Sequence, residues 1–191
     1  MSHFDLAVVL PSCAAAWNLT GGRRFGNKYL PPRRIPGRVY QGPDGFFAVE
    51  PPLGWQQRRH DNSNEVAFVK GKISVSVATV DSEPGDTIED FLEFKKSLVH
   101  HLCPAGEIWE EGKTKVAGAP GSYFTFLCPG SRNRTFIHIS ASLICGKFFI
   151  FKIAAPSSES PALEAEIARI KESFKPGEEL LEECQPLLRA G

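Results

Sequence analysis

The sequence lacks several features that would assign a function directly. It has no apolar run of about 18 residues, the length that predicts a transmembrane helix. The formal net charge of the 191 residues is zero, whereas a dedicated nucleic-acid binder usually carries a basic excess on its folded part. The glycines at 21–22 and 42–45 match no phosphate-binding loop. We therefore expect no membrane-spanning helix, no nucleic-acid partner and no nucleotide loop.

The cysteines are few and show no metal-ligand spacing. Their number, five, is odd, and a chain of this length can form a hydrophobic core without disulfides. We therefore expect reduced thiols, and with them a cytoplasmic location in preference to export. Residues 103 and 128 each stand before a proline at the end of an element, where we expect buried thiols and not a redox pair. The five are Cys13, Cys103, Cys128, Cys145 and Cys184.

The first 44 residues differ in composition from the rest. The apolar run at 4–17 resembles a signal peptide, but no Lys or Arg precedes it, and Asp5 and Pro11 interrupt it. Residues 18–45 are rich in Gly, Pro and Arg, which predicts an extended or disordered arm. An unstructured tail is the favoured interpretation, and a basic arm that binds an anionic partner is the alternative. Its arginines are Arg23, Arg24, Arg33, Arg34 and Arg38.

The remainder has the composition and patterning of one globular domain. Two apolar runs within 134–156 meet at Cys145 and Gly146, which predicts a central β-hairpin. Ser160 and Pro161 then predict the start of a helix over 161–174. Thr87, with Asp90 three residues later, predicts the start of a helix that ends at 102. Further strands are expected at 46–49, 56–59, 65–70, 72–81, 107–116 and 122–128, with a turn at 118–121.

This order of elements predicts an α+β fold, a mostly antiparallel sheet flanked by helices. We place the arm at 1–44, the sandwich domain at 45–178 and an acidic C-terminal tail at 179–191. For that tail a short helical turn and a loose chain both stay open.

The candidate functional side chains lie on the predicted strands. His138, Ser140 and Ser142 share one parity of their strand, and Ser74 and Ser76 share the polar parity of theirs. We expect them to form one sheet face of small hydroxyls and an imidazole, with an open groove that a helix, the arm or a partner covers. A Ser–His nucleophile is the alternative, although no glycine-flanked elbow or orienting acid is present.

One cluster of metal-capable side chains occurs, at the end of the first predicted helix. The adjacent His100 and His101 diverge by about 100° on a helix. A metal-binding pair on a helix instead needs a spacing of three or four residues, which places both ligands on one face. His100 and Cys103 are two ligands, too few for a structural zinc site. We therefore predict no metal and no cofactor.

Several short motifs resemble the PsbP-like family, an αβα sandwich shared by an extrinsic photosystem II subunit and the Ran-binding factor Mog. The resemblance covers roughly residues 45–176. It implies an accessory protein, not an enzyme, that docks on other proteins, and it supplies no catalytic residues. The motifs are Phe46-Phe47 before residues 52–55, the helix after Thr87, residues 118–120, residues 146–149 and Ser173-Phe174.

These observations lead to a ranked expectation. The first is a non-enzymatic protein that binds a protein or peptide on its sheet face or rim. The alternative is a small-ligand-binding or hydrolytic module that uses His138 and Ser140. A third, weaker option is an anion binder that uses the arm from Arg23 to Arg38. The partner and the oligomeric state stay open.

Overall fold

The computed structural model describes residues 33–34, 39–42, 45–59, 64–130, 134–158 and 163–189. The signal-like run at 4–17 and the predicted helix start at Ser160 and Pro161 lie outside these residues, as do Cys13, Arg23, Arg24 and Arg38. Within the described residues, no helix is long and apolar enough to cross a membrane.

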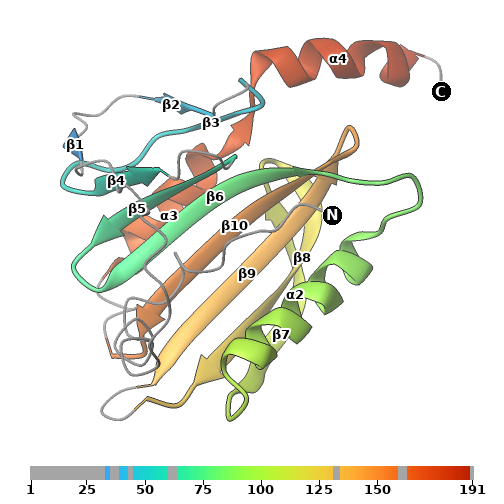
Figure 1. Ribbon diagram of the computed structural model, residues 1–191. Coiled ribbons are helices and arrows are strands. Elements are labelled where there is room, and N and C mark those ends of the chain that lie inside the picture. The colour runs from blue at the N-terminus through green and yellow to red at the C-terminus, as the bar shows by residue number, and fades with distance from the viewer. Residues whose placement is uncertain are drawn as a thin grey trace, which may run out of the picture.

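An eight-stranded sheet forms the centre of the molecule (Figure 1). Its order is β1-β4-β5-β6-β10-β9-β8-β7, and every neighbouring pair is antiparallel. The predicted antiparallel α+β class is therefore confirmed. The strands are β1 Arg33–Arg34, β4 Gln56–Arg59, β5 Glu65–Lys70, β6 Ile73–Asp81, β7 Glu107–Val116, β8 Ala119–Cys128, β9 Thr135–Ile144 and β10 Lys147–Pro156. A small second sheet has the order β11-β3-β2, with β2 Tyr40–Gln41, β3 Phe47–Val49 and β11 Lys175–Pro176.

The predicted central hairpin is confirmed as β9 and β10. Their pairing runs without interruption from Ile144 opposite Lys147 to Thr135 opposite Pro156. The two turn residues, Cys145 and Gly146, have φ of 50° and 72°. Two successive positive φ values characterise the type I′ turn, whose twist matches that of the strands it joins.

The turn between β7 and β8 lies earlier than predicted. Its two central residues are Ala117 and Gly118, and β8 already begins at Ala119. The sequence suggested that Gly121 belongs to the turn, but this glycine pairs with Ser142 inside the sheet. A Cβ atom there would lie 2.1 Å from the carbonyl oxygen of Ala141. Gly121 thus serves close strand packing, which composition alone does not distinguish from a turn.

Two helices cover opposite faces of the large sheet (Figure 1). Helix α2, Ile88–Leu102, begins after Thr87, whose hydroxyl accepts a hydrogen bond from the Asp90 amide as predicted. Helix α3, Glu164–Ser173, lies on the other face and begins three residues after the predicted start at Pro161. The result is a sandwich of helix, sheet and helix.

The strands divide their apolar side chains between two cores. Along β10, Phe148 and Ile150 pack on the α2 side, and Phe149 and Phe151 pack on the α3 side. This alternation follows from the two-residue period of a strand. Because both faces of the central strands are covered, β10 reads as a continuous apolar run.

The C-terminal tail forms a further helix, α4, Glu178–Arg189. Its Leu180 is buried in the α3-side core, and its Cys184 forms a disulfide with Cys145 of the β9–β10 turn. The expectation that all cysteines are reduced is therefore wrong for this pair. The two are 39 positions apart in sequence and meet only through tertiary folding. Cys103 and Cys128 lie outside this disulfide; Cys128 is buried as predicted, whereas Cys103 is only partly buried.

Part of the predicted N-terminal arm also joins the fold. Arg33 and Arg34 pair as β1 with Gln57 and Gln56 of β4. Tyr40 of β2 packs against the α3-side core. These short segments are therefore extended, as predicted, and they pair with the rest of the fold as strands.

Candidate functional site

The predicted site residues fall on opposite faces of the sheet. In an antiparallel ladder, directly opposed residues share a face. His138 lies opposite Ile153, which lies opposite Val75. Ser74 and Ser76 flank Val75 and therefore face α2, while His138 faces α3. The expected single face of serines and an imidazole is wrong, because parity along one strand does not fix the register between strands.

Ser140 and Ser142 share the face of His138 but are fully buried. Ser142 Oγ donates to the carbonyl oxygen of Val116 at 2.8 Å, and Ser140 Oγ donates to that of Phe151 at 3.4 Å. The hydroxyl that meets the imidazole belongs to Thr125, with Oγ1 and Nδ1 3.1 Å apart. Ser140 therefore has a structural role.

His138 lies instead at the base of an open groove of about 660 Å³. The groove lies over β7, β8 and β9 on the α3 side of the sheet. Thr125 and Tyr123 of β8 form its base with His138, and the Tyr123 ring stacks on the imidazole with centroids 5.2 Å apart. Lys171, from the last turn of α3, forms one side. We call this the His138 groove.

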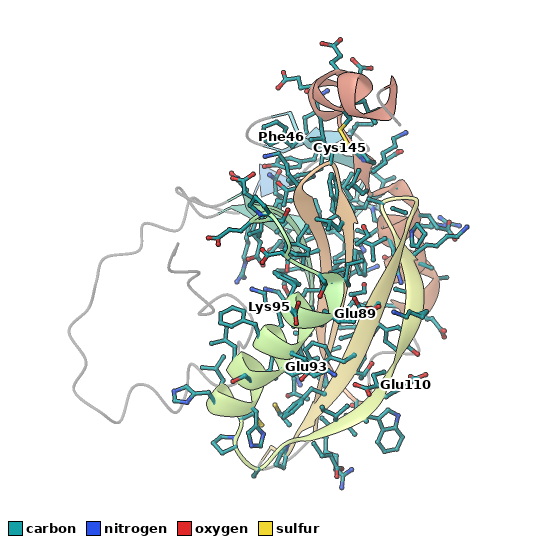
Figure 2. The ribbon with its side chains drawn as sticks, turned by 90° about the vertical axis from the view of Figure 1, so that its right-hand side faces the viewer. Phe46, Glu89, Glu93, Lys95, Glu110 and Cys145 are labelled. Atoms are coloured by element: carbon teal, nitrogen blue, oxygen red, sulfur yellow. A yellow bond between two sulfur atoms is a disulfide. The ribbon has the colours of Figure 1, made fainter. Side chains whose placement is uncertain are left out.

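The rim of the His138 groove comes from the edge strand β7. A β-bulge shifts the register between Ile108 and Glu110, and the intervening Trp109 is 66% exposed. The Glu110 carboxylate accepts a hydrogen bond of 2.7 Å from the Tyr123 hydroxyl. This bond raises the pKa of Tyr123, and burial adds to the shift. Figure 2 shows Glu110 far from Cys145, so the rim and the disulfide occupy opposite ends of the molecule.

Burial controls the protonation of the two basic groups in the groove. It lowers the pKa of His138 to about 4, with a further contribution from the positive charge of Lys171. The imidazole is therefore neutral at pH 7. Burial also lowers the pKa of Lys171, whose Nζ donates to Thr114 Oγ1 at 3.0 Å. The groove therefore offers one ammonium group beside a neutral imidazole.

The face under α2 contains a much smaller cavity. It measures about 40 Å³ and is lined by Ser76, Lys95 and the ion pair between Lys152 and Glu65. Burial, and secondarily the charge of Lys152, lower the pKa of Lys95 to about 8. This space is of the size that holds a water molecule, not a ligand.

The cluster at the end of α2 forms a contact with the core. His100 lies edge-on to Phe126, with ring centroids 6.2 Å apart. No group of three or more His, Cys, Asp or Glu side chains suited to a metal ion occurs in the part of the chain that the structure describes.

Comparison with known proteins identifies the fold. No family model and no curated protein matches the sequence. The structure is similar to that of cyanobacterial PsbP (CyanoP) from Synechocystis sp. PCC 6803, with a TM-score of 0.55 and 13% identity over 73% of this chain and 91% of that one. The chain has the PsbP fold. The fold also occurs in the Ran-binding protein Mog1p of Saccharomyces cerevisiae, with a TM-score of 0.52 and 9% identity over 73% of this chain and 95% of that one.

At these identities the PsbP fold is what the chain shares with the two proteins.

The residues of the groove were mostly not predicted from the sequence, apart from His138. Trp109 offered the one usable signal, because it is an aromatic residue within the strand 107–116, which is otherwise rich in charge. Lys171 and Thr125 offered none, since their proximity to His138 depends on how α3 and β8 pack.

Proposed function

We propose that the protein is a non-enzymatic interaction protein that binds an extended segment of a partner protein in the His138 groove, along the β7 rim. The open groove on the α3 side, with the exposed Trp109 at its rim, is the observation that carries this proposal. Among the similar structures, Mog1p is a Ran-binding protein, so the fold is compatible with docking on another protein.

The rim has the backbone groups that strand addition needs. β7 spans ten residues and ends the order of the described eight-stranded sheet. The outer side of an edge strand presents amide and carbonyl groups to which an extended peptide can add. The bulge at Trp109 interrupts this edge, so we place the added segment along Glu111 to Lys115.

The groove supplies contacts for the side chains of that segment. Trp109 is a candidate anchor, because tryptophan side chains often contribute a large share of the binding free energy at interfaces. Tyr123 adds an aromatic surface with a polar hydroxyl at its end. Side chains of an added strand alternate between the two faces, so every second one would enter the groove.

The chemistry of the groove supports docking over hydrolysis. A serine nucleophile needs a base within hydrogen-bonding distance, and Ser140 donates instead to a backbone carbonyl. His138 contacts Thr125, which lies in a strand and not at a helix N-terminus or an exposed elbow.

Selection of peptides from a displayed random library, with the full chain as target, tests the proposal. Selected peptides should lose at least about tenfold in affinity for Trp109→Ala, as expected when an exposed aromatic anchor is removed. Phe94→Ala is the matched control, because Phe94 is 59% exposed on α2, away from the groove. Equal binding to wild type and Trp109→Ala, or a loss confined to Phe94→Ala, would overturn the assignment.

A further inference from the structure

Lys171 differs from four other partly buried lysines of this fold, Lys70, Lys96, Lys147 and Lys152. Lys70, Lys96 and Lys152 each have a carboxylate oxygen within 2.8 Å of Nζ. Lys147 pairs in the same way with Asp81. An ammonium group that loses hydration is normally compensated by such a partner, because an unpaired buried charge is costly.

Lys171 has only neutral partners among the described residues. Its Nζ donates to the Thr114 hydroxyl at 3.0 Å and lies 5.9 Å from the centre of the Phe151 ring. No carboxylate in the described ranges lies within ion-pair distance of it. An ammonium has three donors, so Lys171 can still donate to a group that enters the groove.

The charges around the groove favour an anion. Arg134, immediately before β9, also lines the groove and has no carboxylate partner among the described side chains. Glu110 is the one carboxylate in the lining, and its Oε1 accepts from Tyr123. Two positive groups thus face one negative group that is already hydrogen-bonded.

We infer that the partner segment places a carboxylate side chain, Glu or Asp, between Lys171 and His138. This inference rests on the proposed docking function and names the chemistry of its central contact. The carboxylate pairs with Lys171 in the way that the carboxylate of Glu166 pairs with Lys70, at 2.7 Å from the ammonium nitrogen. One ammonium and one guanidinium in the lining suit a single carboxylate, whereas phosphate recognition typically uses clusters of arginines.

Two displayed libraries of extended peptides test this inference on the full chain. Both have random flanks, and the central position is fixed as Glu in one and as Gln in the other. We expect the Glu library to yield binders about tenfold tighter, in line with a charge-assisted hydrogen bond in a partly buried site. The preference should vanish for Lys171→Gln, which retains a donor for Thr114.

Lys175→Gln is the control, since Lys175 is an exposed lysine of β11 in the small second sheet and does not line the groove. It should leave the preference for Glu intact. Equal affinities from the two libraries, or a preference for Glu that persists in Lys171→Gln, would overturn the carboxylate contact while leaving docking at Trp109 in place. Failure of both libraries to yield binders would count against the docking function and this inference together.

Discussion

The two faces of strands β8 and β9 differ in how they are covered. On one face, α2 packs on these strands, and the cavity below the helix, which lies mainly over β6 and β10, measures only about 40 Å³. On the other, a groove of about 660 Å³ stays open beside α3. Neighbouring residues serve the two faces in turn, so Phe124 is buried under α2 while Tyr123 lies in the groove. One pair of strands thus supplies a closed packing surface and the surface that we propose for binding.

The side chains account for this difference. On the α2 side, β8 and β9 present Phe124, Phe126, Ile137 and Ile139, which fill the space below the helix. On the α3 side they present several hydroxyl and imidazole groups, which are hydrogen-bonded, together with Leu127 and Phe136. Large apolar groups attract a helix by burial, whereas polar groups of moderate size leave room for a ligand.

The largest expected effect is on the closed face. Phe124→Ala should lower the free energy of unfolding by about 3–5 kcal/mol, because it removes a fully buried aromatic ring. Trp109→Ala should change it by only about 0.5 kcal/mol, since the indole is mostly exposed. Urea unfolding of both variants measures the contrast. Similar losses in the two would mean that the rim also supports folding.

The disulfide provides the next comparison, between the two ends of the β9–β10 hairpin. Cys145→Ser combined with Cys184→Ser should cost about 2–4 kcal/mol, as expected for a cross-link between residues 39 positions apart. Peptide binding at the distant groove should be unchanged. Mass spectrometry of unreduced peptides tests the bond itself. Recovery of both cysteines as thiols would refute it and favour the predicted cytoplasmic location, because disulfides persist mainly in oxidising compartments.

His138 should make stability depend on pH through the groove. Its pKa falls from 6.5 in the unfolded chain to about 4 in the fold, so the unfolded state binds more protons between these values. The free energy of unfolding therefore decreases as the pH falls through this window, by about 1–3 kcal/mol at pH 4.5. His138→Gln should lose less on the same change of pH in urea titrations. Parallel curves for variant and wild type would show that the imidazole is not desolvated.

The smallest effect concerns the buried serine beside the groove. Ser142→Ala removes the donor to the Val116 carbonyl and should cost about 1 kcal/mol without changing peptide affinity. Thermal unfolding and a binding assay on one preparation measure both. A large loss of affinity at unchanged stability would instead give Ser142 the binding role that its parity first suggested.

Much of the fold was predictable because its signals are local. The β9–β10 hairpin follows from two apolar runs around a glycine, and α2 follows from the Thr87 cap and a helical apolar pattern. The failures are at positions where one residue type serves two purposes. Gly121 indicated a turn but lies in a strand, where close backbone packing excludes a side chain.

The site was less predictable because it depends on contacts between distant segments. The parity of His138 along its strand was right, but only the register through Ile153 shows that Ser74 and Ser76 face the other way. The disulfide partner Cys184 and the groove residue Lys171 are brought into place by α4 and α3. Neither position carries a local pattern that indicates its partner.

The most direct test of the binding face compares two tryptophans. Trp109 is at the groove rim, whereas Trp55 is buried and its indole donates to Glu166 at 2.6 Å. In an NMR titration of the full chain with a selected peptide, the indole signal of Trp109 should shift and that of Trp55 should stay in place. A saturating peptide that leaves the Trp109 signal unmoved would contradict docking at the His138 groove.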